Sequence, residues 1–341
     1  MKNYLIQLTP VAPFFFAGEK NFGDNQEANY FAKSNIFPQQ TSILGMLRKE
    51  LLIQDNIYKE NWNYSEDEKT RSIDLIGEKS FQIENNNTDF GKIGKISPVF
   101  LVKTDEKDKG NQYLITAPKD KDLVFTKEKS GKTNLNLTKN KDFIPVIKNF
   151  NPKKGLPNTF IFSSDTEKNI AFNDIFKKFI KVGNAKDKTD GDEEKFFKQV
   201  FYTMEKGFSF AFFAQIDFEL NNFNSIVYMG GDNSSFKIEV KQSKKTFQEI
   251  FINRKSQNDK ITLLSDAYVD EEIYDYCEFA ITETMDFRTL NISQNGIYKN
   301  RNEKYVMLKR GSVFFTNNKP ELIKKISENK ALEKIGYNIF Q

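Results

Sequence analysis

The stretch FPQQTSILGMLRKELL, residues 37–52, carries the pattern best suited to holding a phosphate or a nucleic-acid backbone. The pattern predicts a helix over 42–54, entered from a proline-bearing loop, with Thr41 or Ser42 as the capping hydroxyl. Gly45 costs about 1 kcal/mol relative to Ala inside a helix, which indicates that something approaches the backbone there. A helix start, a glycine and the basic pair that follows suit an anionic ligand. An ordinary amphipathic helix with solvated basic residues is the alternative.

Two further glycine-bearing turns are candidates for contact with an anion. Gly230 and Gly231, inside YMGGDNSSF, would let backbone N–H groups approach a phosphate or a base edge. A plain hairpin turn would explain the same letters. Lys309 and Arg310 are candidates because they adjoin a glycine, with solvated surface charge as the alternative.

Histidine is absent from the sequence, which excludes Ser-His and Cys-His catalysis and removes the commonest general base and metal ligand. Cys277 is the only cysteine, so neither an internal disulfide nor a cysteine-based metal site is possible. Tyr4, Tyr113 or Tyr228 with a nearby lysine could still cleave RNA without a metal, and carboxylates could still hold Mg²⁺. We expect no catalytic residue, no metal and no cofactor.

The length of 341 residues indicates about two domains. The net charge of only +4 predicts that any contact with RNA is local rather than made through a broad positive field. Neither a signal peptide nor an apolar run long enough to cross a membrane is visible. These features predict a soluble, cytoplasmic protein without a membrane partner.

The first half of the chain has the order strand, helix, hairpin. The predicted elements are a strand over 3–9, the helix over 42–54 and a hairpin formed by 98–103 and 112–116. This order opens a ferredoxin-like unit. The lysine-rich stretch 119–141 is either a protruding hairpin or a solvated loop.

The second half of the chain predicts another mixed α+β unit. The expected helices are 170–182, 192–205, 244–255 and 319–328, and the expected strands are 207–218, 226–229, 236–240, 260–265, 276–283 and two strands within 304–315. The aromatic row of 208–218 could stack bases, but period-two aromatic rows usually face a core. We therefore expect this row to be buried.

The chain resembles the RAMP superfamily, and most closely the third subunit of the type III-B (Cmr) CRISPR effector. The pieces that carry the resemblance are TPVAPFFFAGEKNFG (9–23), FPQQTSILGMLR (37–48), SPVFLVKTDEKDKGNQYLITAPKDKDL (97–123), YMGGDNSSF (228–236), RGSVFF (310–315) and IGYNIF (335–340). They follow the family's order over nearly the whole chain. Ala17-Gly18 stands where the family usually has Arg-Asp-Gly, and Asp232 stands where it has Glu.

The resemblance implies an α+β fold of two ferredoxin-like domains in tandem, over 1–160 and 161–341, with the lysine-rich insertion 119–141 as a β-hairpin thumb. It implies a non-catalytic subunit that holds the crRNA 5′ handle and caps the backbone filament beside the large polymerase-like subunit. The RNA-binding candidates it implies are Gln39, Gln40, Thr41, Ser42, Gly45, Arg48, Gly230, Gly231, Asp232, Lys20, Asn21, Lys309 and Arg310. The equivalent type III-A subunit, a precursor-processing endoribonuclease and a scaffold that contacts only proteins are the alternatives.

Overall fold

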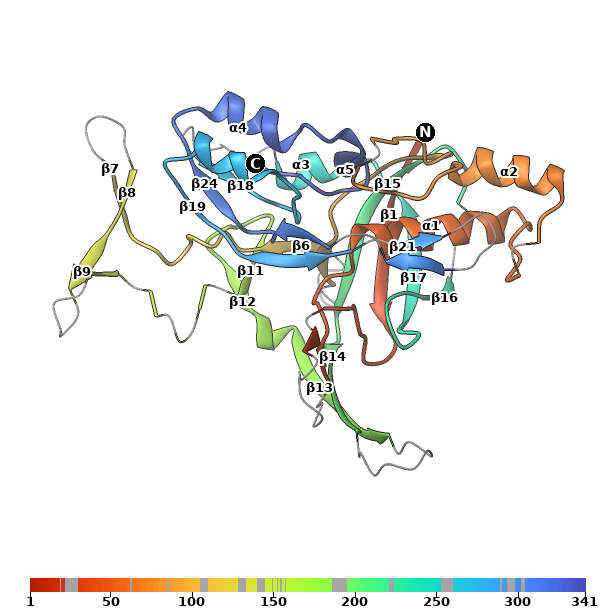
Figure 1. Ribbon diagram of the computed structural model, residues 1–341, viewed down its shortest axis with the longest axis horizontal. Coiled ribbons are helices and arrows are strands. Elements are labelled where there is room, and N and C mark those ends of the chain that lie inside the picture. The colour runs from red at the N-terminus through yellow and green to blue at the C-terminus, as the bar shows by residue number, and fades with distance from the viewer. Residues whose placement is uncertain are drawn as a thin grey trace.

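A nine-stranded antiparallel sheet forms the centre of the computed structural model (Figure 1). Its order is β12-β11-β6-β5-β15-β1-β17-β16, and β4 also pairs with β15. The strands of this sheet are β1 (Lys2–Pro10), β4 (Ile93–Ile96), β5 (Phe100–Thr104), β6 (Asn111–Thr116), β11 (Thr159–Phe162), β12 (Asn169–Ala171), β15 (Phe208–Ile216), β16 (Asn224–Tyr228) and β17 (Ser235–Gln242). The structure describes residues 1–18, 20–21, 30–61, 63–84, 86–104, 110–127, 133–139, 145–148, 150–151, 153, 155–156, 158–185, 195–220, 224–252, 260–288, 290–292, 298–301 and 304–341.

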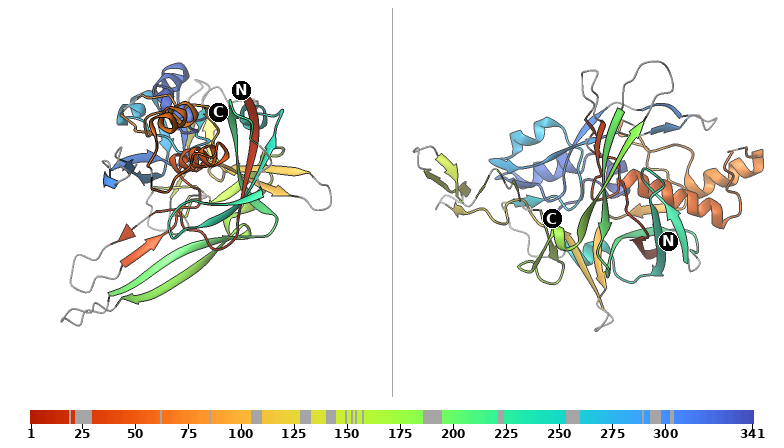
Figure 2. Two further views of the ribbon diagram at one scale, coloured as in Figure 1. Left: turned by 90° about the vertical axis from the view of Figure 1, so that its right-hand side faces the viewer. Right: turned by 90° about the horizontal axis from the view of Figure 1, so that it is seen from below.

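A second, four-stranded sheet projects from this body as an arm (Figure 2). Its strands, in the order β13-β14-β3-β2, are β13 (Phe176–Ala185), β14 (Lys195–Met204), β3 (Tyr30–Lys33) and β2 (Lys20–Asn21). The strand β14 pairs antiparallel with β13 and parallel with β3. The arm therefore joins a segment close to the N-terminus to a hairpin from the middle of the chain.

The arm overturns the two helices expected over 170–182 and 192–205. Apart from the short 3-10 turn η1 (Phe172–Asp174) and the single residues Ile175 and Glu205, the described parts of both ranges are strands. Residues 192–194 lie outside the described residues. Apolar residues three and four apart fit one helix face, but the same stretches are rich in aromatic and β-branched residues, which favour strands. The pairing of β13 with β14 satisfies both backbones and decides between the two patterns.

The other elements are shorter. The helices are α1 (Gln40–Gln54), α2 (Glu66–Ile76), α3 (Phe247–Phe251), α4 (Lys319–Ile326), α5 (Lys330–Lys334) and the 3-10 turn η2 (Glu271–Tyr276). The strands are β7 (Phe125–Lys127), β8 (Thr133–Leu135), β9 (Leu137–Lys139), β10 (Pro145–Ile147), β18 (Lys260–Thr262), β19 (Phe279–Ile281), β20 (Thr284–Phe287), β21 (Leu290–Ile292), β22 (Tyr298–Arg301), β23 (Tyr305–Leu308) and β24 (Val313–Phe315).

The α+β class is confirmed, and so are most of the elements expected outside the arm. The hairpin of β5 and β6, the strands β15, β16 and β17 and the helices α1 and α4 lie where the patterns placed them. The expected helix over 244–255 is shorter, since α3 covers five residues and 253–255 lie outside the described residues. The helix α2 was not expected, although Ser65 and Glu68 form a capping box that the sequence displays.

The lysine-rich stretch contains two short strand pairs, β7 with β8 and β9 with β10, which extend to one side of the body in Figure 1. Residues 130–132 at its centre lie outside the described residues. A division of the chain at residue 160 passes through β11, and the principal sheet takes strands from both halves. The two expected domain ranges stay a prediction.

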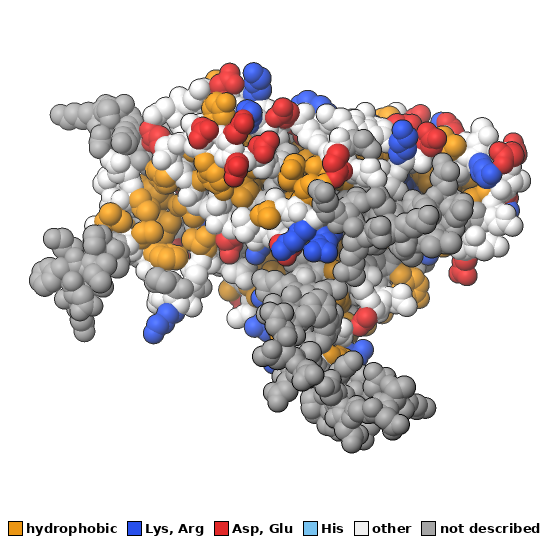
Figure 3. Space-filling view, viewed as in Figure 1, with side chains coloured by type: hydrophobic (Ala, Val, Ile, Leu, Met, Phe, Trp, Pro, Cys, Tyr) orange, Lys and Arg blue, Asp and Glu red, His pale blue; other side chains and the backbone are white. Residues whose placement is uncertain are grey.

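The surface of the body is mixed in character. Figure 3 shows acidic, basic and hydrophobic side chains close together on the face seen in Figure 1. Within the described part of the chain, no helix is long and apolar enough to span a bilayer.

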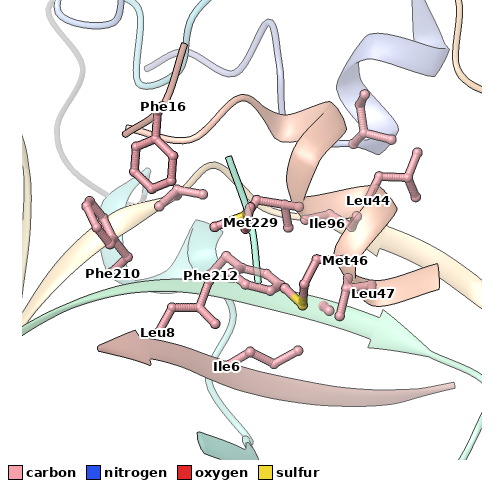
Figure 4. Packing of buried hydrophobic residues seen from close by; sticks show 14 of the residues in the cluster. Ile6, Leu8, Phe16, Leu44, Met46, Leu47, Ile96, Phe210, Phe212 and Met229 are labelled. Atoms are coloured by element: carbon pink, nitrogen blue, oxygen red, sulfur yellow. The ribbon is translucent and has the colours of Figure 1, made fainter. Parts of the chain in front are cut away.

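The main hydrophobic cluster lies between the principal sheet and α1, and a second cluster packs α3 against other side chains of the same sheet. Phe210, Phe212, Ala214 and Ile216 of β15 are fully buried, which confirms that this aromatic row faces the interior. Figure 4 shows the side chains of α1 packed against those of the sheet. Full burial of an aliphatic or aromatic side chain stabilises the fold by roughly 1.5–3 kcal/mol, so this row fixes the position of the neighbouring strands and of α1.

The cap expected for α1 is wrong. The N-cap residue is Gln39, and its side chain makes no capping hydrogen bond. The backbone N–H of Gln40 instead donates to the hydroxyl of Tyr337 at 3.0 Å. A residue from the C-terminal segment thus replaces the local hydroxyl, which no pattern within residues 37–52 could reveal.

Candidate nucleic-acid interface

A cavity of about 480 Å³ opens where several segments far apart in the sequence meet. Its lining includes residues 33–37 before α1, Lys119 after β6, Tyr202 on the arm and the turn of Lys309 and Arg310. Phe37 begins the FPQQT piece, Lys119 lies in the 97–123 piece and Arg310 begins the RGSVFF piece, so the fold brings three of the sequence motifs into one site. We call this cavity the motif pocket.

Arg310 lines the motif pocket and makes three kinds of contact within the protein: an ion pair, a hydrogen bond to a carbonyl and a contact with an aromatic ring. Its Nη2 lies 3.0 Å from Oδ2 of Asp266, and its Nη1 donates to the carbonyl of Val99 at 2.7 Å. The guanidinium also lies over the ring of Phe37, with 4.1 Å from Cζ to the ring centroid. The side chains of Arg310 and Asp266 are only 7% and 12% exposed. Arg310 therefore neutralises the buried carboxylate of Asp266 and orients Phe37. Because the guanidinium is paired within the protein, it contributes little positive charge to a ligand in the pocket.

The turn that carries Arg310 requires a glycine. Gly311 has φ +84°, and a Cβ there would lie 2.7 Å from the carbonyl oxygen of Ala117. The backbone N–H of Lys119 donates to the Gly311 carbonyl at 2.8 Å, and the neighbouring Asp120 pairs with Lys260 at 2.6 Å. The passage after β6 is thereby fastened to the C-terminal turn, which closes one wall of the pocket.

The motif pocket carries an excess of positive charge. Five of its lining residues are cationic and two are acidic. Lys119 pairs with Glu283, and Arg310 pairs with Asp266. Among the residues that the structure describes, Lys33, Lys178 and Lys309 form no ion pair. Three lysines beside aromatic side chains suit a ligand that combines negative charge with flat rings.

The predicted residues at the start of α1 lie next to the motif pocket in sequence but do not line it. Gln40 is fully buried, and its amide donates to the carbonyls of Ser97 at 2.8 Å and Gly336 at 3.1 Å. Gln39, Thr41 and Ser42 are half-buried. The N–H groups of residues 40, 42 and 43 are already hydrogen-bonded within the protein, so they are not free for an anion.

Gly45 and Arg48 differ in their surroundings. Gly45 is exposed, and a Cβ there would meet nothing within 4 Å. Arg48 donates to the carbonyl of Lys79 at 2.9 Å and lies 5.5 Å from the ring centroid of Phe90. Burial lowers the pKa of Arg48 to about 10, against a smaller opposing effect from Asp89. The guanidinium thus serves an internal contact between α1 and the loop after α2.

The glycine pair after β16 approaches another part of the same chain. A Cβ on Gly230 would lie 2.6 Å from the carbonyl oxygen of Phe15, and the N–H of Gly231 donates to that oxygen at 2.8 Å. Asp232 is exposed and lies 3.9 Å from Nζ of Lys181 on the arm. Packing against residues 14–16 therefore accounts for both glycines without a ligand.

The segment 14–16 separates the glycine pair from the motif pocket. Phe15 bonds to Gly231 on one edge, while Phe16 accepts the N–H of Asn35 at 2.6 Å on the other. Asn35 lines the pocket, and Gly231 does not. Of the remaining candidates, Lys20 and Asn21 pair through their backbones with β3 at the edge of the arm. The structure thus gathers Lys309 and Arg310 in the pocket and leaves the other candidates outside it.

Sequence reasoning missed Lys33, Lys178 and Phe37 as members of a common site. Basic residues are frequent along the whole chain, so a lysine in the sequence does not by itself mark a site. The pairing of β3 with β14 and of β14 with β13 brings Lys33 and Lys178 together, although they are more than 140 residues apart in sequence. Phe37 is placed by its contact with Arg310.

Comparisons with known proteins agree with this fold. The chain matches two cryo-EM structures of the type III-B Cmr-beta, one bound to cognate target RNA and the other to cognate target RNA and AMPPnP, each with a TM-score of 0.52 and 16% identity over 100% of this chain and 96% of that chain. A Csm3-Csm4 subcomplex of the type III-A system has a TM-score of 0.39 at 12% identity, covering 92% and 93% of the two chains. A search of curated proteins finds no match.

The principal antiparallel sheet and the order of the sequence motifs indicate a CRISPR-associated protein of the RAMP type. The model of the CRISPR-associated protein family Cas_Cmr3 matches residues 6–340. The chain belongs to this family, which confirms the resemblance to the Cmr subunit.

Proposed function

We propose that this chain is the crRNA-binding subunit of a type III-B effector and that the motif pocket receives part of the 5′ handle. The observation that carries the proposal is the convergence of Lys33, Lys178 and Lys309, free of ion pairs in the described structure, on a cavity lined by three of the family-like motifs. Phosphates would contact the lysines, and an unstacked base would enter among the aromatic side chains.

The pocket has room for about one nucleotide and is too small for a double-stranded RNA. Small-molecule sites usually measure about 300–1,000 Å³, and this cavity of about 480 Å³ falls in that range. Double-stranded RNA would instead need a long surface that follows its minor groove. The proposal therefore concerns a single-stranded segment with one nucleotide inserted.

We further propose that the subunit is not a nuclease. Two of the tyrosines considered as bases are poorly placed for catalysis. The hydroxyl of Tyr4 is buried and bonded to the backbone at Phe218 and Leu220, at 3.3 Å each. Burial raises the pKa of Tyr113, which makes its phenolate less accessible at neutral pH.

The assembly role extends the same proposal. Two ferredoxin-like units in tandem would cap the backbone filament, with the large polymerase-like subunit and the backbone RAMP subunits as neighbours. The strand pairs β7–β8 and β9–β10 extend to one side of the body and would serve as the thumb. A cytoplasmic location follows from this role.

The test measures binding of the full chain to the small RNA that copurifies with the assembled effector. A labelled oligonucleotide with the 5′ sequence of that RNA is titrated at several salt concentrations. The variant Lys33→Gln/Lys309→Gln removes two free lysines from the pocket. We expect weaker binding and a salt slope that is shallower by about 1.4, because each phosphate contact on a single strand contributes about 0.7.

The matched control is Lys237→Gln/Lys241→Gln, which removes two exposed lysines that pair with Glu239 on β17. We expect its affinity and salt slope to equal those of the wild type. Equal losses in both variants would overturn the pocket as the binding site, and no binding by the wild type would favour a scaffold that contacts only proteins. Cleavage of repeat RNA in EDTA would establish the endoribonuclease alternative.

A further inference from the structure

The small sheet of β18, β24 and β19 is fully covered on one face and only partly covered on the other. On the face beneath α4, Ile261 and Phe314 are fully buried. On the opposite face, Phe279 and Phe315 lie directly opposite each other and pack against Phe125 of β7. Phe125 and Phe279 remain half-buried there. This second face therefore leaves aromatic surface open to solvent.

Three aromatic rings pack together on this open face. The ring centroids of Phe279 and Phe315 are 4.4 Å apart, and that of Phe125 lies 5.0 Å from Phe315 and 6.0 Å from Phe279. Ile281, two residues after Phe279 on the same side of β19, is also half-buried. We call these four residues the aromatic patch. Figure 3 shows hydrophobic side chains gathered over this part of the body.

Carboxylates border the aromatic patch. Glu278 directly precedes Phe279, Asp275 lies in η2 just before it, and Asp122 lies in the turn that leads into β7. Asp122, Asp275 and Glu278 form no ion pair within the described part of the chain. Figure 3 shows acidic side chains between the hydrophobic ones and the region of α4. The border therefore carries negative charge that the protein itself does not neutralise.

Two lysines beside the aromatic patch already have partners. Nζ of Lys260 lies 2.6 Å from Oδ2 of Asp120, and Nζ of Lys121 donates to the carbonyl of Thr166 at 3.0 Å. A nucleic acid binds through cations that are available to its phosphates, and these two are not. Aromatic surface with an acidic border is instead suited to a ligand that combines apolar groups with positive charge.

We propose that the aromatic patch binds a polypeptide segment of another protein, one that combines apolar and basic side chains. Its apolar side chains cover Phe279 and Ile281 and remove their surface from water. Its lysines or arginines lie opposite Asp122, Asp275 and Glu278, and an arginine also packs on the aromatic rings. The inference goes beyond the proposed function, because none of these residues lines the motif pocket.

Photocrosslinking identifies the molecule that binds the aromatic patch. A photoreactive phenylalanine analogue replaces Phe279 in the full chain, which is coexpressed with the other subunits of the effector and irradiated in the complete assembly. We expect a crosslink to a polypeptide segment in which lysine and arginine outnumber aspartate and glutamate. A crosslink to RNA, a crosslink to an acidic segment, or the absence of any crosslink to another chain would each overturn the proposal.

A charge reversal tests the role of the acidic border. A labelled peptide with the sequence of the crosslinked segment is titrated with the full chain and with the variant Asp122→Lys/Glu278→Lys. We expect the variant to bind the peptide roughly tenfold more weakly, because like charges then face each other across the contact. Added salt should weaken binding by the wild type. Equal affinity of the variant and the wild type would overturn the proposal.

The matched control is Glu60→Lys/Asp67→Lys, which makes the same change in net charge at two exposed residues near α2. It should bind the peptide as the wild type does. An equal loss in the control would overturn the proposal, because the effect would then come from net charge alone. The two variants should have equal affinity for the handle oligonucleotide, since neither changes the motif pocket. Failure of the proposed function is distinct, because it appears only in the response of that oligonucleotide to substitutions in the pocket.

Discussion

Arg310 and Asp266 form a buried, hydrogen-bonded ion pair, with Nη2 and Oδ2 3.0 Å apart and the backbone N–H of Arg310 also donating to Oδ1 at 3.0 Å. The same guanidinium bonds to Val99 and covers Phe37. The guanidinium therefore links the C-terminal turn to the residue before β5 and to the segment that leads into α1. The contacts of this one side chain thus fix a wall of the motif pocket and join the C-terminal turn to segments more than 200 residues earlier in the sequence.

The first prediction concerns the loss of this pair. Arg310→Ala should lower the free energy of unfolding by about 3–5 kcal/mol, because it leaves the Asp266 carboxylate buried without a counter-charge. Urea unfolding followed by circular dichroism measures the change. The double variant Arg310→Met/Asp266→Asn should lose less than Arg310→Ala, because it leaves no charge unpaired. A loss below 1 kcal/mol for Arg310→Ala would contradict the role assigned to the pair.

Two glycines provide the second prediction, since the same substitution should act in opposite directions. Gly311→Ala should destabilise the protein by at least about 1–2 kcal/mol, because the residue has a positive φ and little space beside Ala117. Gly45→Ala should stabilise it by about 1 kcal/mol, because Gly45 lies in a helix with open space around it. Thermal unfolding of the two variants measures both effects. If Gly45→Ala also weakened RNA binding, the helix would be contacted by the ligand as its sequence suggested.

The sequence predicts those elements whose pattern of apolar residues is decided within the element itself, and it does not predict those that depend on pairing with a distant segment. The helix α1 and the strand β15 follow from their own periodicity, because each buries one face whatever its neighbours are. The strand β13 does not, since its apolar spacing fits a helix equally well and only its pairing with β14 decides. The residues of the motif pocket could be predicted from the sequence only in part. The glycine beside Arg310 marks that turn, whereas Lys33 and Lys178 are brought there by sheet register alone.

The third prediction follows from a buried carboxylate on α1. Burial raises the pKa of Glu50 above 4.5, against a smaller opposing effect of Lys49. Between 4.5 and the folded pKa, the unfolded state holds fewer protons than the folded state, so stability falls as the pH rises through that window. Glu50→Gln removes this effect. The variant should unfold at a higher temperature than the wild type at pH 7, and the difference should disappear below pH 4.5.

A scan of melting temperature against pH tests this prediction, and Glu249 is unsuitable as a control because it caps α3. Glu66→Gln is better suited, since its exposed carboxylate makes only a surface pair with Lys69. We expect little pH dependence from that variant. A Glu50→Gln variant that is less stable than wild type at pH 7 would show that the carboxylate has a favourable partner.

The last prediction concerns the start of α1, where Tyr337 replaces a local cap. The hydroxyl of this buried residue accepts the N–H of Gln40 at 3.0 Å. Burial raises its pKa, so the hydroxyl stays protonated and neutral at every pH at which the protein would be handled. Tyr337→Phe should cost about 0.5–2 kcal/mol, the range for loss of a helix cap, and should speed hydrogen exchange at Gln40. The control Tyr274→Phe, at an exposed side chain, should change stability by less than about 0.5 kcal/mol.

The effect of Tyr337→Phe on RNA affinity distinguishes a start of α1 that contacts RNA from one that contacts only the protein itself. If α1 begins at a site that RNA occupies, Tyr337→Phe frees an N–H group there, and affinity for the handle oligonucleotide should rise as stability falls. If the helix start is purely internal, as its hydrogen bonds with the C-terminal segment indicate, affinity should stay unchanged while Gln40 exchanges faster. We expect the second result, because Gln40 is fully buried and the RNA contacts that we propose are made by the lysines of the motif pocket.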